Sequence, residues 1–458
     1  MSALKRTISG WKELWVVLFD NYLVMTKRKG SGPSTNTVED RNEWRRKLLS
    51  AILARKVSQE SNSIFRLKTI TAETTSSHDG PAHPSGQLTG RVSCTLPFGV
   101  HDGRRFYAVG SEDGVWIGAP QQPNSIQRVI PLRMVTQLAF LVEYGLLVVL
   151  ADKILYAIGI ESVVPSLTRD ADRPSDVFAF QRISNPHTPI HFFSVGRLAG
   201  RTLIISKKRK GVDSVFRILE VFLPAGEQGP PNIKVSKDFF LPSDTYDLLF
   251  LKTKVCILCP RGFEIMDLSD FSSATIPLEE DLQQMGKRPG AHKPIAMLRI
   301  REDEFVLCYE EFGLYVDKRG APSRSPPVIE WEGVAAHAAW HAPYVLLFHD
   351  SFIEVRHIES GRLAQIMLGR DVRCLWDGRG VIPAEHPAFD DEFEDPRTPR
   401  IHAVLDDSDV LSHNPYNQTP HERDHVVELV PTERLVVPGT RYSPSLLSVA
   451  DTLPPYTP

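Results

Sequence analysis

The feature of this sequence that most restricts its fold is a recurring pattern of short apolar runs separated by turns, clearest over residues 294–361. Its turns are a REDE segment, an acidic and glycine pair, and the segments His-Asp and Glu-Ser-Gly. Short runs of apolar, β-branched or aromatic residues between such turns are typical of antiparallel strands in small sheets. A chain that repeats this unit predicts an all-β fold, a β-propeller. The runs are residues 295–300, 305–309, 314–316, 344–348 and 352–358.

The same pattern extends through most of the chain from residue 91 onward. Strands that each follow a turn recur as VWIGA, ILYAIGI, FRILEVF, FEIMDL, LYVD and IEVRHI. Their spacing is uneven, about 40 to 60 residues, at or above the range for four-stranded propeller blades. Uneven spacing favours a propeller with inserted loops over a regular repeat array.

The phrases EFVLCYEEFGLYVDKRG, IEWEG and SFIEVRHIESG resemble the citron homology (CNH) domain, in particular the C-terminal CNH domains of fungal Rho-type guanine nucleotide exchange factors. The resemblance covers roughly residues 90–385 and implies about seven blades. We therefore expect a CNH-like propeller over residues 89–437, with an exposed acidic loop near 385–400 and a strand at 426–430 that helps to close the last blade. The Pro/Ser-rich tail, 438–458, is predicted to be disordered.

The N-terminal residues 1–56 carry a different pattern. Residues 14–19 and 22–25 predict a hairpin around an Asp-Asn turn. Residues 39–56 predict an amphipathic helix with acidic residues first and basic residues last. A strand pair followed by a helix with a central tryptophan resembles a pleckstrin homology (PH) domain. Too few residues separate the hairpin from the helix for a full PH sheet, so we expect a truncated PH-like segment with weak or absent lipid binding.

Residues 57–88 follow this segment and are rich in Ser, Thr, His, Pro and Gly. Such a composition cannot build a packed core and is typical of flexible connections. The sequence therefore predicts a disordered linker between the PH-like segment and the propeller.

Composition narrows the classes of function. The chain has 53 basic and 56 acidic side chains, so it lacks the basic excess of nucleic-acid binders. Its five cysteines are an odd, scattered set, which argues for a reducing compartment. The start MSALKRTISG has no apolar core for a signal peptide, and charges interrupt the most apolar window, 138–160. We expect a cytoplasmic protein.

Two groups of residues have spacings found in metal sites. Cys256 and Cys259 form a CxxC pair, but the strand-like segment KVCILCP would place them on opposite faces, so two ordinary thiols are expected. His337 and His341 have HxxxH spacing without the glutamate of a zinc protease. Together with His349 and His357, they are interpreted as a surface or turn histidine cluster.

The third candidate is a run of four basic residues, Lys207, Lys208, Arg209 and Lys210, between the strands predicted at 202–206 and 215–222. This position predicts a solvated hairpin tip. A basic tip can contact anionic lipid or an acidic partner. These four residues are therefore the candidate interaction surface.

The sequence holds no nucleophile elbow, phosphate-binding loop or dinucleotide fingerprint, so no catalytic, cofactor or metal site is predicted. The resemblance implies a non-catalytic regulatory or scaffolding module of Rho-type GTPase signalling that binds a Rho-family small GTPase or cortical proteins. Since exchange requires a helical Dbl homology domain, we expect none from this chain. The alternative is a CNH-propeller adaptor in vesicle tethering, although tethering chains continue into long α-solenoids.

Overall fold

The computed structural model of the chain divides into two units, Met1–Ile64 and Phe65–Pro458. The first unit holds a three-stranded antiparallel sheet of order β1-β2-β3. The hairpin predicted at 14–25 is confirmed by pairing of β2 with β3, whereas β1 was not anticipated. The helix predicted at 39–56 lies outside the described residues except for Arg46. The strands are β1 (Ser2–Thr7), β2 (Gly10–Leu18) and β3 (Leu23–Thr26).

Only part of the chain is described by the structure. Within the first unit, the described residues are 2–7, 10–18, 23–26, 46 and 63–64. In the second unit they are residues 65–70, 88–100, 103–120, 122–164, 181–223, 231–288, 290–382, 400–406 and 425–432. Most of the loop predicted near 385–400 and all of the tail at 438–458 lie outside them.

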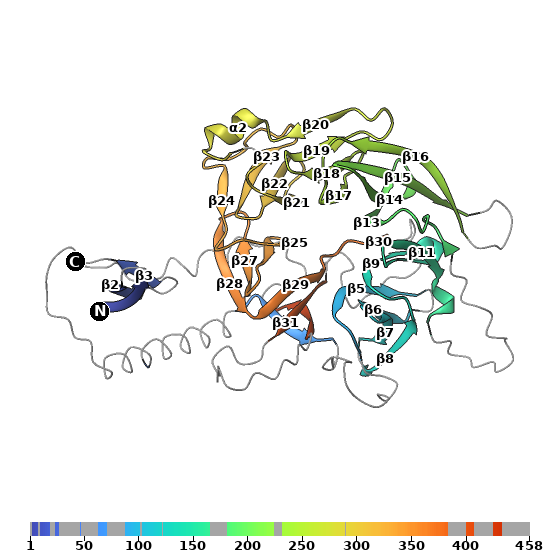
Figure 1. The fold of residues 1–458 in the computed structure, drawn as a ribbon, viewed down its shortest axis with the longest axis horizontal. Helices are drawn as coiled ribbons and strands as arrows, with labels where there is room; N and C mark the ends of the chain where they lie inside the picture. Colours follow the sequence, from blue (N-terminus) through green and yellow to red (C-terminus); the bar gives the residue numbers. More distant parts are fainter. Residues whose placement is uncertain are drawn as a thin grey trace, which may run out of the picture. The chain divides into compact units, whose positions relative to one another are not determined.

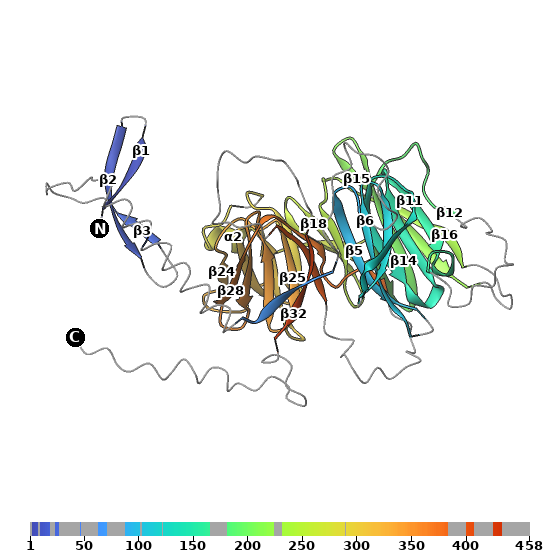
Figure 2. The same ribbon diagram turned by 90° about the horizontal axis from the view of Figure 1, so that it is seen from below.

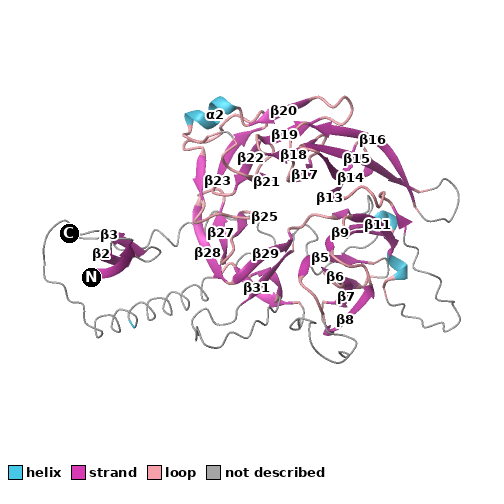
Figure 3. Ribbon diagram, in the orientation of Figure 1, coloured by secondary structure: helices cyan, strands magenta, loops and turns pink. Residues whose placement is uncertain are grey.

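The second unit is a seven-bladed β-propeller, as predicted, and almost all of its described elements are strands (Figure 3). Each blade has four antiparallel strands, to which the second blade adds one parallel strand, and the blades follow one another around a centre (Figure 1). The first blade contains β5 (Val92–Gly99), β6 (Arg105–Ser111), β7 (Gly114–Ala119) and β8 (Gln122–Ile130), and the second contains β9 (Val135–Leu141), β10 (Leu146–Ala151), β11 (Ile154–Gly159) and β12 (Gln181–Arg182). The third contains β13 (Ile190–Leu198), β14 (Arg201–Lys210), β15 (Asp213–Phe222) and β16 (Asn232–Leu241). The fourth contains β17 (Asp247–Phe250), β18 (Val255–Cys259), β19 (Gly262–Met266) and β20 (Ser273–Ile276).

The last three blades complete the ring. They are β21 (Pro294–Arg299), β22 (Glu304–Tyr309), β23 (Phe312–Asp317) and β24 (Val328–Glu330); β25 (His337–His341), β26 (Tyr344–Phe348), β27 (Phe352–His357) and β28 (Arg362–Leu368); and β29 (Arg370–Trp376), β31 (Ile401–Asp406), β32 (Val426–Pro431) and β4 (Phe65–Thr69). A fifth strand, β30 (Val381–Ile382), joins the second blade. The described helices are the short α2 (Glu279–Gln284) and two single 3₁₀ turns, η1 (Val142–Tyr144) and η2 (Ile160–Ser162).

The core of the propeller lies between neighbouring blades. Successive side chains of a strand point to opposite faces, so a middle strand that is apolar throughout supplies two cores at once. In β18, Val255 and Ile257 pack toward the third blade while Cys256 and Leu258 pack toward the fifth. Cys259 is on the same side as Ile257, which confirms that the two cysteines of the CxxC pair face apart.

The ring closes by pairing strands from the two ends of the propeller. β32 lies between β31 and β4 in the seventh blade, so the predicted closing role of residues 426–430 is confirmed (Figure 2). β4 falls inside the segment 57–88, and the prediction of a linker is wrong for these residues. The physical reason is that β4 is an outermost strand whose side chains, apart from Phe65, are exposed. Its sequence FRLKT therefore lacks the apolar run that marks an inner strand.

Candidate functional site

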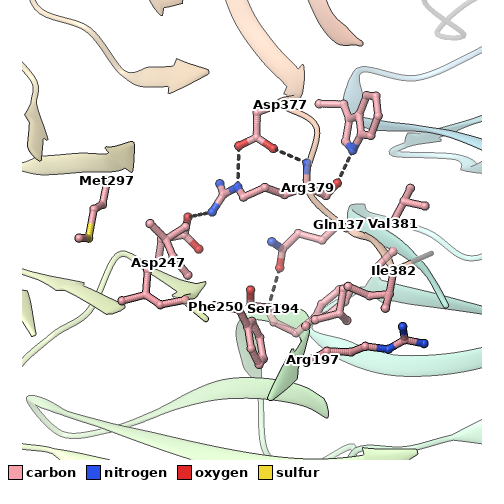
Figure 4. A pocket seen from close by; sticks show the side chains of 18 of the residues that line it. Gln137, Ser194, Arg197, Asp247, Phe250, Met297, Asp377, Arg379, Val381 and Ile382 are labelled. Atoms are coloured by element: carbon pink, nitrogen blue, oxygen red, sulfur yellow. Dashed lines mark hydrogen bonds and ion pairs between the residues drawn. The ribbon is translucent and has the colours of Figure 1, made fainter. Parts of the chain in front are cut away.

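The centre of the ring is a cavity of about 1060 Å³. It is lined by the first strand of every blade, so all seven blades contribute side chains to one space. Figure 4 shows polar and charged residues from several blades pointing into it. The labelled lining residues include Gln137, Ser194, Arg197, Asp247 and Arg379.

A segment of the seventh blade, residues 377–382, crosses this cavity and is called the strap here. After β29 the chain leaves its own blade and forms β30, which pairs in parallel with β9 of the second blade. The backbone N–H of Phe140 donates to the carbonyl of Gly380 at 2.7 Å. Gly380 has a φ of +90°, and a Cβ there would lie 3.2 Å from the Leu138 carbonyl oxygen, so glycine is required.

Ion pairs hold the strap to two further blades. Arg379 donates from Nε to Asp377 and from Nη1 to Asp247 of the fourth blade, both at 2.7 Å. His337 of the sixth blade lies with Nε2 3.0 Å from the Asp377 carboxylate (Figure 4 shows the arginine and both aspartates). The strap therefore ties the second, fourth, sixth and seventh blades together across the cavity.

The charges in this network stabilise one another. Burial disfavours the ionised form of Asp377. The charges and hydrogen bonds of Arg379 and His337 outweigh this effect and hold the pKa of Asp377 well below the usual range. Burial also disfavours protonated His337, but Cys374 and Asp377 outweigh that effect and raise its pKa to about 10. At neutral pH, two cations and two carboxylates thus meet in the cavity.

Cys374 and His337 together with Asp377 bring the residue types of a cysteine hydrolase into one place. Burial raises the pKa of the Cys374 thiol, and the charge of His337 offsets this rise only in part. The Asp377 carboxylate faces both His337 and Arg379, and Arg379 reaches on to Asp247, so the contacts form an ion-pair network between blades.

The four histidines predicted to form a surface or turn cluster are not brought together, and that prediction is wrong. His337 and His341 stand at the two ends of β25, where positions four apart are separated by about 13 Å. His337 lines the cavity, while His341 is buried and packs edge-on against Phe65 with ring centroids 5.0 Å apart. His349 is buried beside Glu354, and His357 contacts Ser360. The described residues hold no cluster of His, Cys, Asp or Glu able to bind a metal ion.

The basic run at 207–210 is not a hairpin tip, which corrects the prediction. β14 continues through Lys210, and the turn is made by Gly211 and Val212. β14 is an inner strand that is buried without a break from Thr202 to Lys207, and the Lys207 ammonium donates to Asp244 at 2.8 Å and to the Thr245 carbonyl at 3.1 Å. Sequence reasoning missed this burial because both partners come from the loop between β16 and β17, more than 30 residues further along the chain.

The other three residues of the run stay near the surface. Lys208 lies 3.8 Å from the Asp238 carboxylate, and Arg209 and Lys210 are exposed. The candidate interaction surface is therefore reduced to Lys208, Arg209 and Lys210. The strap, by contrast, was not singled out in advance, although its sequence DGRGVI carries the glycine-rich turn that ends β29.

No described helix is both long and apolar enough to cross a membrane.

Comparison with known proteins agrees with the fold. Rho1 guanine nucleotide exchange factor 1 of Schizosaccharomyces pombe is 31% identical over 302 residues, 62% of this chain and 22% of that protein. The human serine/threonine-protein kinase MRCK gamma is 24% identical over 277 residues, 58% of this chain and 16% of that kinase. This chain thus spans less than a quarter of either relative.

A solved structure described as the AfRom2 CNH domain superposes with a TM-score of 0.59 at 26% identity, covering 80% of this chain and 99% of that domain. Residues 103–378 match the CNH domain. This match takes in the strands from β6 to β29, and with them the first strands of six blades that line the cavity. The chain belongs to the CNH domain family.

Proposed function

We propose that this chain is a non-catalytic regulatory or scaffolding module of Rho-type GTPase signalling that acts through protein–protein interaction. The observation that carries the proposal is the CNH match over residues 103–378 together with relatives named as Rho1 exchange factors. Those relatives and the matched kinases favour GTPase signalling over vesicle tethering. The proposed partners are a Rho-family small GTPase or cortical signalling proteins, with the chain in the cytoplasm at the cell cortex.

The physical character of the propeller suits a binding role. Its blades are packed on both faces and tied across the centre by the strap, so loops and outer strands are displayed on a rigid frame. In the central network, each carboxylate already faces a cation from another blade. Arg209 and Lys210 are exposed at the end of β14 and offer charges that an acidic partner can contact.

The proposal is tested by direct binding of the 458-residue chain to a Rho-type GTPase. We expect saturable binding by biolayer interferometry at micromolar concentrations, with a Ras-type GTPase as the negative control. Charge reversal at Arg209 and Lys210 should weaken it several-fold if these residues contact an acidic partner. Equal binding to both GTPases, or to neither, in the GDP-bound, GTP-analogue-bound and nucleotide-free states would contradict the proposal.

A further inference from the structure

Among the strands that the structure describes, the outermost strand of the third blade, β16, has an open edge. It pairs with β15 on one side and ends the sheet order on the other (Figures 1 and 3). With ten residues, it is as long as any described strand, and seven of its ten residues are exposed. An edge of this kind presents unpaired backbone N–H and carbonyl groups to which another strand can be added.

Apolar side chains lie on one face of this edge. Val235 pairs with Leu219 and Phe240 pairs with Val215, and these two β15 residues are four positions apart. Positions an even number apart share a face, so Val235 and Phe240 point to the same side. Their exposed fractions are 55% and 67%, high values for a valine and a phenylalanine on an otherwise well-packed blade.

Cations lie on the opposite face. Lys234 pairs with Glu220 and Lys237 with Ile218, positions that alternate with Leu219. Their ammonium groups lie over the rings of Phe222 and Phe271, 5.7 and 5.4 Å from the ring centroids. A ring attracts a cation without neutralising its charge.

The acidic residue of the strand does not balance these lysines. Both oxygens of the Asp238 carboxylate accept from Arg217, at 2.9 and 2.8 Å, and Lys208 lies 3.8 Å away. These contacts hold the pKa of Asp238 below its usual range. Asp238 and Arg217 also lie on the face of Val235 and Phe240, so the acid on the face of the lysines is Glu220, which lies 3.7 Å from Arg201. The edge therefore carries net positive charge on one face and, on the other, apolar side chains on either side of an ion pair.

Three kinds of ligand can be compared at this edge by their charge and by their ability to pair with its backbone groups. A second copy of β16 would place lysines against lysines, which disfavours self-pairing. A lipid surface would satisfy the cations but leave the edge N–H and carbonyl groups without partners. An extended peptide with acidic residues at alternate positions can pair with the edge backbone groups, place carboxylates against the lysines and cover Val235 and Phe240 with the residues between.

We propose that the free edge of β16 binds an extended, acidic segment of a partner protein by strand addition. Carboxylates of the segment face Lys234 and Lys237, and the residues between them are apolar and cover Val235 and Phe240. This inference goes beyond the proposed function by naming a second surface and the chemistry of its ligand. It does not depend on binding of a GTPase.

The test uses a fluorescent eight-residue peptide of alternating valine and glutamate, titrated with the full chain and followed by anisotropy. We expect saturable binding. It should weaken about tenfold for a peptide of the same composition in two blocks, all valines first and all glutamates last, because alternation places the two residue types on opposite faces. A peptide N-methylated at every residue should lose binding, since it keeps the charges but has no backbone N–H to donate to a neighbouring strand.

Protein variants locate the site. Lys234→Glu combined with Lys237→Glu should weaken binding about tenfold, whereas Arg319→Glu with Arg362→Glu, the same charge change at exposed positions of other blades, should leave it unchanged. Equal binding of the alternating and block peptides, no effect of the Lys234 and Lys237 changes, or no binding at all would overturn the proposal. Lysine-dependent flotation with phosphatidylserine vesicles, without peptide binding, would overturn it in favour of a lipid surface.

Discussion

Replacing Phe65 by alanine should lower the free energy of unfolding of the propeller by about 3–5 kcal/mol, the range for truncating a fully buried phenylalanine. Phe65 is 1% exposed and begins the strand that closes the ring. Its ring packs against His341 and Tyr344, with centroids 5.0 and 6.4 Å away. Its backbone is held by Gln365, which accepts from the N–H at 2.9 Å and donates to the carbonyl at 3.0 Å. Loss of the ring therefore leaves a cavity between the sixth and seventh blades.

The measurement is guanidinium denaturation followed by tryptophan fluorescence. Arg66→Ala is the matched control, because Arg66 is the next residue of β4 and its side chain is exposed. We expect the control to change the free energy of unfolding by less than about 0.5 kcal/mol. If Phe65→Ala is no more destabilising than Arg66→Ala, β4 does not close the ring.

The second large effect is expected at Glu354, which is 0% exposed in the sixth blade. Its carboxylate accepts from Arg356 Nε at 2.6 Å and from the Glu332 N–H at 2.9 Å, and it lies 3.1 Å from His349 Nε2. Removal of one member of a buried ion pair leaves the other without its counter-charge. Glu354→Ala should therefore lower the free energy of unfolding by about 3–5 kcal/mol.

The pH dependence gives an independent check on Glu354. Burial disfavours its ionised form, but the His349 hydrogen bond and the Arg356 charge outweigh burial and lower its pKa. A carboxyl group whose pKa is lower in the folded state stabilises the fold above its unfolded pKa, about 4.3, and loses that contribution as the pH falls through its folded pKa. The stability of Glu354→Ala should thus fall less steeply in acid.

Glu330→Ala is the control for this change. Glu330 forms an exposed ion pair with Lys287 at 3.4 Å, a kind of contact that contributes about 0–1 kcal/mol. Equal denaturation midpoints for Glu354→Ala and Glu330→Ala, at pH 7 and in acid, would show that the buried network does not stabilise the sixth blade.

The parts of the fold that could be predicted are those that depend on residues close together in the sequence. Inner strands such as β18 and β26 are apolar throughout because both faces are buried, so they stand out against the turns that flank them. β4 was missed because an outermost strand keeps one buried side chain, Phe65, and is otherwise polar or exposed. Its assignment to the propeller depends on β32, more than 350 residues away.

The candidate site was less predictable because its residues meet only in the closed ring. Lys207 is bound by Asp244 and Thr245 of the loop between β16 and β17, and nothing in the local basic run indicates these contacts. The strap depends on Asp247, which lies 132 positions before Arg379 in the chain. The histidines of β25 are a further example. Alternation within the strand predicts that His337 and His341 share a face, but it does not predict that His337 contacts Asp377 and His341 contacts Phe65.

The most direct test of the proposed function is release of a fluorescent nucleotide from a Rho-type GTPase in the presence of this chain at micromolar concentrations. The described part of the second unit is a strand-built propeller whose longest helix is α2, and the proposed function assigns it a role in binding alone. We predict that the chain binds the GTPase and leaves the release rate at its spontaneous value. Acceleration well above that rate would contradict a role through binding alone.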